Sequence, residues 1–129
     1  MTPIFELENA LRTGDIVFTR IPGFPFRQIA DATGTWTNHV GIVVGFNSAG
    51  AVVAESRVPL SRRTRFANFV RRSADGRVAV LRLPRPLSDA EILRLGQAMR
   101  CRLGRLYDTG FNLSVAQRCV RWDRALAGT

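Results

Sequence analysis

The stretch NHVGIVVG at residues 38–45, followed by NSAG at 47–50 and AVVAES at 51–56, decides the fold. Two runs of β-branched and small apolar residues flank a turn rich in Asn, Ser and Gly, a pattern that predicts a β-hairpin. The first run contains His39, the only histidine of the chain, and the second contains Glu55. Any chemistry that needs an imidazole base near neutral pH therefore depends on this hairpin.

The register of the hairpin decides whether His39 and Glu55 can meet. Side chains alternate between the two faces of a strand, so His39 shares a face with Gly41 and Gly45. A five-residue loop at residues 46–50 pairs Gly41 with Glu55 and places Glu55 diagonally across from His39, whereas a four-residue loop places them on opposite faces. In the first register the carboxylate orients the imidazole ring, and the two glycines leave space beside it.

Both polar residues also have a purely structural interpretation. In that interpretation His39 is a half-buried side chain that satisfies a backbone carbonyl. Glu55 is then an exposed charge at the end of a strand, paired with Arg57. The residues of the hairpin by themselves leave the structural and the catalytic interpretations open.

Length and composition predict one globular domain spanning residues 1–129, large enough to bury a core. Hydrophobic residues make up 46% of the chain, and no run approaches the ~18 apolar residues of a membrane span. Residues 1–8 contain two acidic side chains and lack the basic and apolar segments of a signal peptide. We expect a cytoplasmic location.

The charge of the chain predicts anionic partners. The net charge is +9, and every basic residue is an arginine. Arginine binds carboxylates and phosphates bidentately, so a cluster of arginines predicts contact with an anionic substrate, a membrane surface or the cell wall; solvated side chains are the alternative. No recognition helix or metal knuckle accompanies the charge, and we expect no specific nucleic acid. The cluster comprises Arg62, Arg63, Arg65, Arg71, Arg72 and Arg77.

The sequence predicts neither a cofactor nor a metal. One histidine and two cysteines, Cys101 and Cys119, do not show the close spacing of a zinc site. We expect both cysteines to be free thiols, because a domain of this size does not need a disulfide. Sequence does not fix the oligomeric state.

The remaining pattern predicts an α+β domain in which a small, mainly antiparallel sheet packs against helices. A capping box at Ser88 and Glu91 opens the clearest helix, and Pro84 and Pro86 end the strand before it. The predicted strands outside the hairpin are 16–19 and 77–83, and the predicted helices are 26–32, 64–72, 89–105 and 119–127.

Five short segments, in this order, carry a family resemblance: GDIV at 14–17, HVGIV at 39–43, VAES at 53–56, LGRLYDTGF at 103–111, and Cys119. They resemble the circularly permuted branch of the NlpC-type papain-like cysteine hydrolases, which includes YiiX/YebB-like proteins and relatives of lecithin retinol acyltransferase. In that branch the histidine strand precedes the cysteine helix.

The resemblance implies a permuted papain-like fold and a cysteine site. Cys119 would be the nucleophile, His39 the general base, Glu55 the residue that orients His39, and Tyr107 a contributor to the oxyanion site. The implied activity is that of a cysteine hydrolase or acyltransferase. It would act through a thioester on an amide or ester in a cell-wall peptide, a lipid or an acylated amide. The alternative is a non-catalytic member of the same scaffold that binds anionic polymers or membranes through its arginines.

Overall fold

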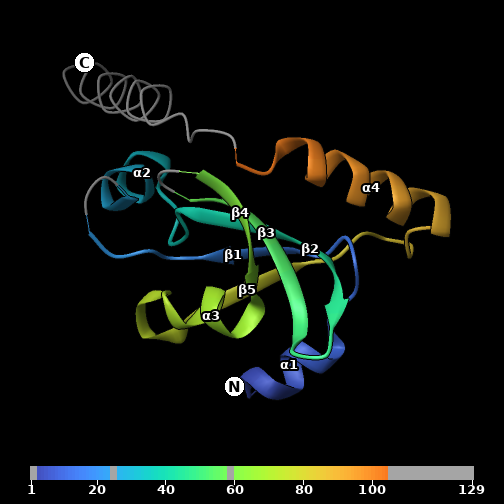
Figure 1. Cartoon of the computed structure of the whole chain (residues 1–129). Helices are drawn as coiled ribbons and strands as arrows, with labels where there is room; N and C mark the ends of the chain where they lie inside the picture. The colour runs from blue at the N-terminus through green and yellow to red at the C-terminus, as the bar shows by residue number, and fades with distance from the viewer. Residues whose placement is uncertain (1–2, 24–25, 58–59, 105–129) are drawn as a thin grey trace.

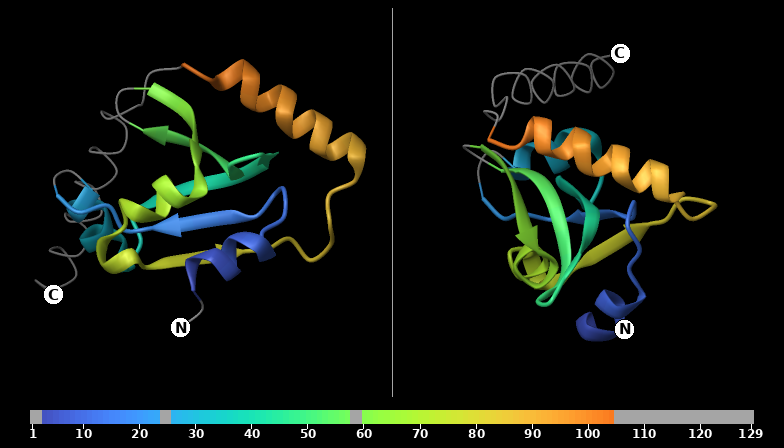
Figure 2. Two further views of the ribbon diagram at one scale, coloured as in Figure 1. Left: turned by 60° about the horizontal axis from the view of Figure 1, so that its bottom comes forward. Right: turned by 45° about the vertical axis from the view of Figure 1, so that its right-hand side comes forward.

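The computed structural model describes residues 3–23, 26–57 and 60–104, and Figures 1 and 2 show their arrangement. A five-stranded antiparallel sheet has the order β4-β3-β2-β1-β5. The predicted α+β class is confirmed. The elements are α1 Ile4–Ala10, β1 Ile16–Thr19, α2 Phe26–Thr33, β2 His39–Asn47, β3 Gly50–Arg57, β4 Leu60–Arg65, α3 Phe66–Arg71, a short 3-10 turn Ala74–Gly76, β5 Val78–Leu81 and α4 Asp89–Arg102.

The central hairpin has the predicted pairing but reaches it through a different turn. Strands β2 and β3 are joined by a two-residue turn, with Asn47 opposite Gly50, and Gly41 lies opposite Glu55. A β-bulge between Val43 and Gly45 shifts the register by one residue. Without the bulged residue, the short turn would pair Gly41 with Ser56 and put Glu55 on the face away from His39.

The hydrophobic core lies between the inner face of the sheet and helix α3. Val17, Val43 and Val53 extend from three adjacent strands and are fully buried. Phe66 and Phe69 of α3 cover them from below the sheet in the view of Figure 1. This packing holds the inner face of β2, which carries His39, against a rigid helix.

Gly41 is needed for close packing rather than for open space. A Cβ atom at this position would overlap Cγ1 of Val53 and lie 3.0 Å from Cε2 of Phe69. At Gly45, no heavy atom lies within 4 Å of where a Cβ would be. The prediction that both glycines leave space beside the histidine is therefore wrong for Gly41, because Val53 and Phe69 fill that space.

We expect Gly41→Ala to lower the free energy of unfolding by about 1–3 kcal/mol, because the added methyl group overpacks a core of stiff side chains. Gly45→Ala, on the same strand, is the matched control and should change the stability by less than about 0.5 kcal/mol. Urea unfolding followed by tryptophan fluorescence measures both. Equal stabilities of the two variants would contradict the packing described here.

Strand β4 was not predicted. The prediction of a helix over residues 64–72 is wrong at its start, because Thr64 and Arg65 continue a ladder with β3 and α3 begins at Phe66. Hydrogen bonding to β3 outweighs the local preference of these residues for a helix. Three arginines of the cluster, at 62, 63 and 65, thus lie on an edge strand, where charge discourages pairing with another chain.

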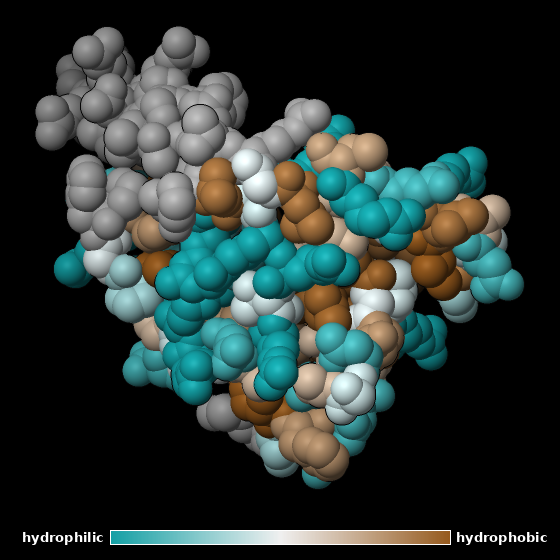
Figure 3. All heavy atoms as spheres, in the orientation of Figure 1, coloured by the Kyte–Doolittle hydropathy of each residue, from teal (hydrophilic) through white to brown (hydrophobic). Residues whose placement is uncertain are grey.

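Helix α4 has the predicted capping box, with Ser88 accepting a hydrogen bond from the Glu91 backbone and Glu91 bonding back. None of its residues is fully buried. The helix stands over the outer face of the sheet, and a cavity of about 420 Å³ separates Leu95 and Met99 from Val40 and Ile42. Figure 3 shows apolar side chains at the surface along α4 and beneath it. Within the described residues, no helix has the length and apolar character needed to cross a membrane.

Candidate active site

His39 opens strand β2 and lies between two aromatic rings. Its ring centroid is 5.5 Å from that of Phe69 and 6.0 Å from that of Phe26, which meets it edge-on. The side chain is 5% exposed, so packing against these rings shields the imidazole from water. The imidazole is therefore held in one orientation by packing from α2 and α3.

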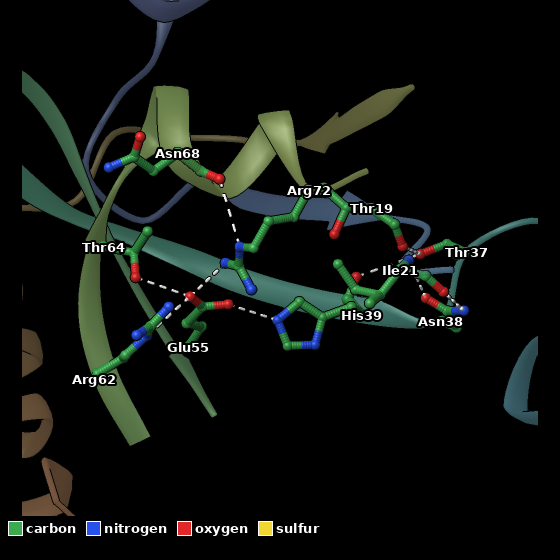
Figure 4. A network of polar contacts seen from close by, with 10 residues as sticks. All are labelled: Thr19, Ile21, Thr37, Asn38, His39, Glu55, Arg62, Thr64, Asn68 and Arg72. Atoms are coloured by element: carbon green, nitrogen blue, oxygen red, sulfur yellow. Dashed lines mark hydrogen bonds and ion pairs between the residues drawn. The ribbon is translucent and has the colours of Figure 1, made fainter. Parts of the chain in front are cut away.

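Glu55 lies on the same face of the sheet and binds the ring directly. Its Oε2 atom is 2.7 Å from Nε2 of His39 (Figure 4). Its Oε1 atom accepts hydrogen bonds from Thr64 at 2.8 Å and from Arg72 at 2.5 Å, and Nε of Arg62 is 3.6 Å away. The Glu55 side chain has no exposed surface. The interpretation of Glu55 as an exposed charge paired with Arg57 is wrong, because Glu55 points inward and its oxygens are occupied by other partners.

The neighbours of Glu55 keep it ionised. Burial by itself raises the pKa of this carboxyl, but hydrogen bonds from His39, Arg72 and Thr64 outweigh burial and lower the pKa to about 2. An ionised carboxylate can only accept hydrogen bonds. Nε2 of His39 must therefore carry the proton in the contact with Glu55, which leaves Nδ1 of the neutral ring as a proton acceptor.

The lowered pKa of Glu55 predicts how stability depends on pH. Because this pKa falls from 4.5 to about 2 on folding, the stabilisation from Glu55 is present above pH 4.5 and is lost as the pH falls toward 2. We expect the loss of unfolding free energy between pH 6 and pH 2.5 to be smaller in Glu55→Gln than in the native protein by about 2–3 kcal/mol. Denaturant unfolding across this pH range measures the difference. Parallel curves for the two proteins would contradict an ionised, buried Glu55.

His39 also lines a cavity. Nδ1 makes no hydrogen bond to any residue in the described part of the chain, and the ring lines a cavity of about 310 Å³ together with Phe26 and Arg72. A group entering this cavity can reach Nδ1 while Glu55 holds Nε2. With Glu55 orienting the ring, His39 can accept a proton from a thiol or hydroxyl in this cavity and return it to a leaving group.

Three supporting residues were missed by sequence reasoning. Arg72 and Thr64 fix Glu55, as described above. Asn38 fixes the segment before α2, since its side chain accepts a hydrogen bond from the Ile21 backbone and donates to the Ile21 and Phe26 carbonyls. The position of Asn38 next to His39 could have indicated its supporting role. No pattern in the sequence indicates the role of Arg72, because only the fold brings the end of α3 to Glu55.

The structure does not place two of the predicted site residues. Cys119 and Tyr107, and the predicted helix 119–127, lie outside the described residues. Cys101 is a free thiol, exposed on α4. His39 and Glu55 are thus the two predicted site residues that the structure brings together.

The hairpin, the inward histidine and the buried carboxylate on an antiparallel sheet, with the candidate cysteine later in the sequence, define a papain-like domain of permuted order. A family model matches residues 10–119, and the chain belongs to that family, the permuted papain-like amidase enzymes of the YaeF/YiiX type, family C92. The predicted family and fold are confirmed.

A solved structure is similar to this one. The crystal structure of the metalloprotein YiiX from Escherichia coli O157:H7 matches with a TM-score of 0.68 and 26% sequence identity, over 75% of this chain and 53% of that one. The chain thus spans about half the length of YiiX. No curated protein matches the sequence.

The solved YiiX structure is described as that of a metalloprotein. Among the residues that the structure describes, no three His, Cys, Asp or Glu side chains come together as metal ligands do. The one buried imidazole is bound through Nε2 to Glu55, whose other oxygen is occupied by Arg72 and Thr64. The described residues therefore do not fit a metal site.

Proposed function

We propose that this protein is a cysteine amidase or esterase in which Cys119 is the nucleophile, His39 the general base and Glu55 the residue that orients His39. The observation that carries the proposal is the contact between Nε2 of His39 and Glu55, which leaves Nδ1 unengaged by the described residues and beside a cavity. Family membership supports amide hydrolysis.

The reaction follows from the protonation states. His39 accepts the proton of the Cys119 thiol at Nδ1, and the thiolate attacks the carbonyl carbon of an amide or ester. As the C–N or C–O bond breaks, His39 returns the proton to the leaving group, and the acyl group remains on Sγ as a thioester. His39 then takes a proton from water as the water oxygen attacks the thioester carbonyl carbon. The C–S bond breaks, the acyl group leaves as a carboxylic acid, and His39 returns its proton to Sγ, which regenerates the thiol.

Tyr107 and the backbone N–H of Cys119 are the proposed donors to the oxyanion that forms in each attack. Such a donor contributes on the order of 3 kcal/mol to stabilising the transition state. Glu55 acts through His39, since it holds the ring and stabilises the imidazolium in each step. Transfer to an acceptor other than water would make the same site an acyltransferase.

The test of this proposal is to trap the acyl group. Native protein mixed with p-nitrophenyl hexanoate and quenched within one turnover should carry one hexanoyl group on the Cys119 peptide in mass spectrometry. His39→Ala should carry much less. Acylation of Cys101 instead, or equal acylation of Cys119 in both proteins, would count against the proposal.

The second candidate function is a non-catalytic module that binds anionic polymers or membranes. The exposed arginines at 62, 63 and 65 on edge strand β4 favour it. Figure 3 shows a broad hydrophilic area over β3 and β4. In that case binding to vesicles containing phosphatidylglycerol should weaken steeply with salt and survive Cys119→Ala.

A further inference from the structure

We propose that Arg57 is a specificity-determining residue that binds an anionic group of the substrate in the cavity beside His39. The inference rests on the proposed function and deepens it by naming a substrate class. That class is an amide or ester with an apolar portion and a carboxylate or phosphate a few bonds from the reacting carbonyl.

The register of the sheet puts Arg57 next to the base. Gly41 of β2 lies opposite Glu55 of β3, and the strands are antiparallel. Two residues further along each strand, on the same face, come His39 and Arg57. Both line the cavity of about 310 Å³. Arg57 and His39 thus line the same cavity from facing positions on neighbouring strands, and Glu55, two residues before Arg57, binds the imidazole.

The charges around the cavity do not balance. The described lining residues include Arg57 and Arg72 and no acidic side chain. Arg72 is committed to Glu55. Glu55 also binds Thr64 and His39, so both of its oxygens are occupied. Among the residues that the structure describes, no ion pair joins Arg57 to a carboxylate, so none of them neutralises its charge.

The remaining walls of the cavity are apolar and strengthen the attraction between this charge and an anion. Ile21, Pro22 and Phe26 form the apolar part of the lining. Arg57 is a half-buried residue, and apolar walls lower the local dielectric and increase the attraction of a cation for an anion. They also favour an apolar group next to the anion. The volume is near the lower limit for small-molecule sites, which favours a compact ligand.

The experiment compares two esters that differ in one charge. The probes are p-nitrophenyl hydrogen adipate and p-nitrophenyl hexanoate, which share a six-carbon acyl chain, with spontaneous hydrolysis subtracted. We expect the native protein to favour the adipate ester in kcat/KM by about 10- to 100-fold, the range of a charge-assisted hydrogen bond. In Arg57→Gln the ratio should fall to about 1, mostly through KM, while hydrolysis of the neutral ester is retained.

Two further variants sharpen the result. Arg57→Glu should reverse the preference and favour the neutral ester. Arg63→Gln is the control, because Arg63 lies opposite Ala54 on the outer face of the sheet and should leave the ratio unchanged.

Hexanoyl esters of 3-carboxy-4-nitrophenol and of 4-nitrophenol test whether the anion belongs to the leaving group instead. No charge preference in either pair would overturn the inference.

A binding measurement separates this inference from the proposed function. Adipate monoamide should bind Cys119→Ala protein, and adding Arg57→Gln should weaken binding by about 10-fold or more. If hydrolysis depends on Cys119 but shows no preference for the charged ester, only the role of Arg57 is refuted. Arginine-dependent binding without hydrolysis that depends on Cys119 refutes the enzyme and keeps the anion site. Equal binding by the two proteins refutes the anion site.

Discussion

Replacing Cys119 by alanine is expected to lower the hydrolysis of p-nitrophenyl hexanoate by on the order of a thousandfold or more, because a nucleophile that forms a covalent intermediate cannot be bypassed by its neighbours. The effect should fall on kcat, with binding of an uncleaved amide retained. Stopped-flow release of nitrophenolate measures it.

The chain provides a matched control for this prediction. Cys101 is exposed on α4, away from the inner face that carries His39, so Cys101→Ala should keep native activity. Thermal unfolding of both variants checks that each is folded. Residual activity of Cys119→Ala within tenfold of native would mean that the thiol is not the nucleophile.

Replacing Glu55 by alanine is expected to lower the free energy of unfolding by about 3–5 kcal/mol, because it leaves buried charge without its partner. Arg72 and His39 would lose their ligand, and Thr64 would lose an acceptor. For a chain of this length the loss corresponds to a fall in Tm of about 10–20 °C.

Two comparisons make the stability prediction specific. Glu55→Gln retains the shape and part of the hydrogen bonding, so its stability should lie between those of the native protein and the alanine variant. Arg63→Ala, at an exposed position on the neighbouring strand, should cost less than about 0.5 kcal/mol. A loss below about 1 kcal/mol in Glu55→Ala would indicate a solvent-screened pair, in contradiction to its burial.

The hairpin could be predicted because its signals are local. Apolar runs around an Asn- and Gly-containing turn fixed the strands, and alternation placed His39 and Glu55 on one face if Gly41 paired with Glu55. The bulge that produces this pairing was not predictable. It is one extra residue in β2 that compensates for the short turn, so that Glu55 still points to the buried face of the sheet.

Features that depend on long-range contacts were missed. Strand β4 reads locally as a polar, arginine-rich segment, and only pairing with β3 makes it a strand. Arg72 reaches Glu55 because α3 folds back under the sheet, which no spacing in the sequence encodes. The contact between His39 and Glu55 was therefore predictable, while the groups that keep the carboxylate ionised were not.

The most direct test of the cysteine site is the pH dependence of iodoacetamide alkylation at each cysteine, followed by peptide mass spectrometry in native protein and in His39→Ala. We predict that Cys119 reacts well below the pH of about 8.5 at which an ordinary thiol ionises, and that it loses this reactivity without His39. Exposed Cys101 is the internal reference. Alkylation of Cys119 that follows Cys101 in both proteins, or that is absent in both, would contradict a Cys119–His39 pair.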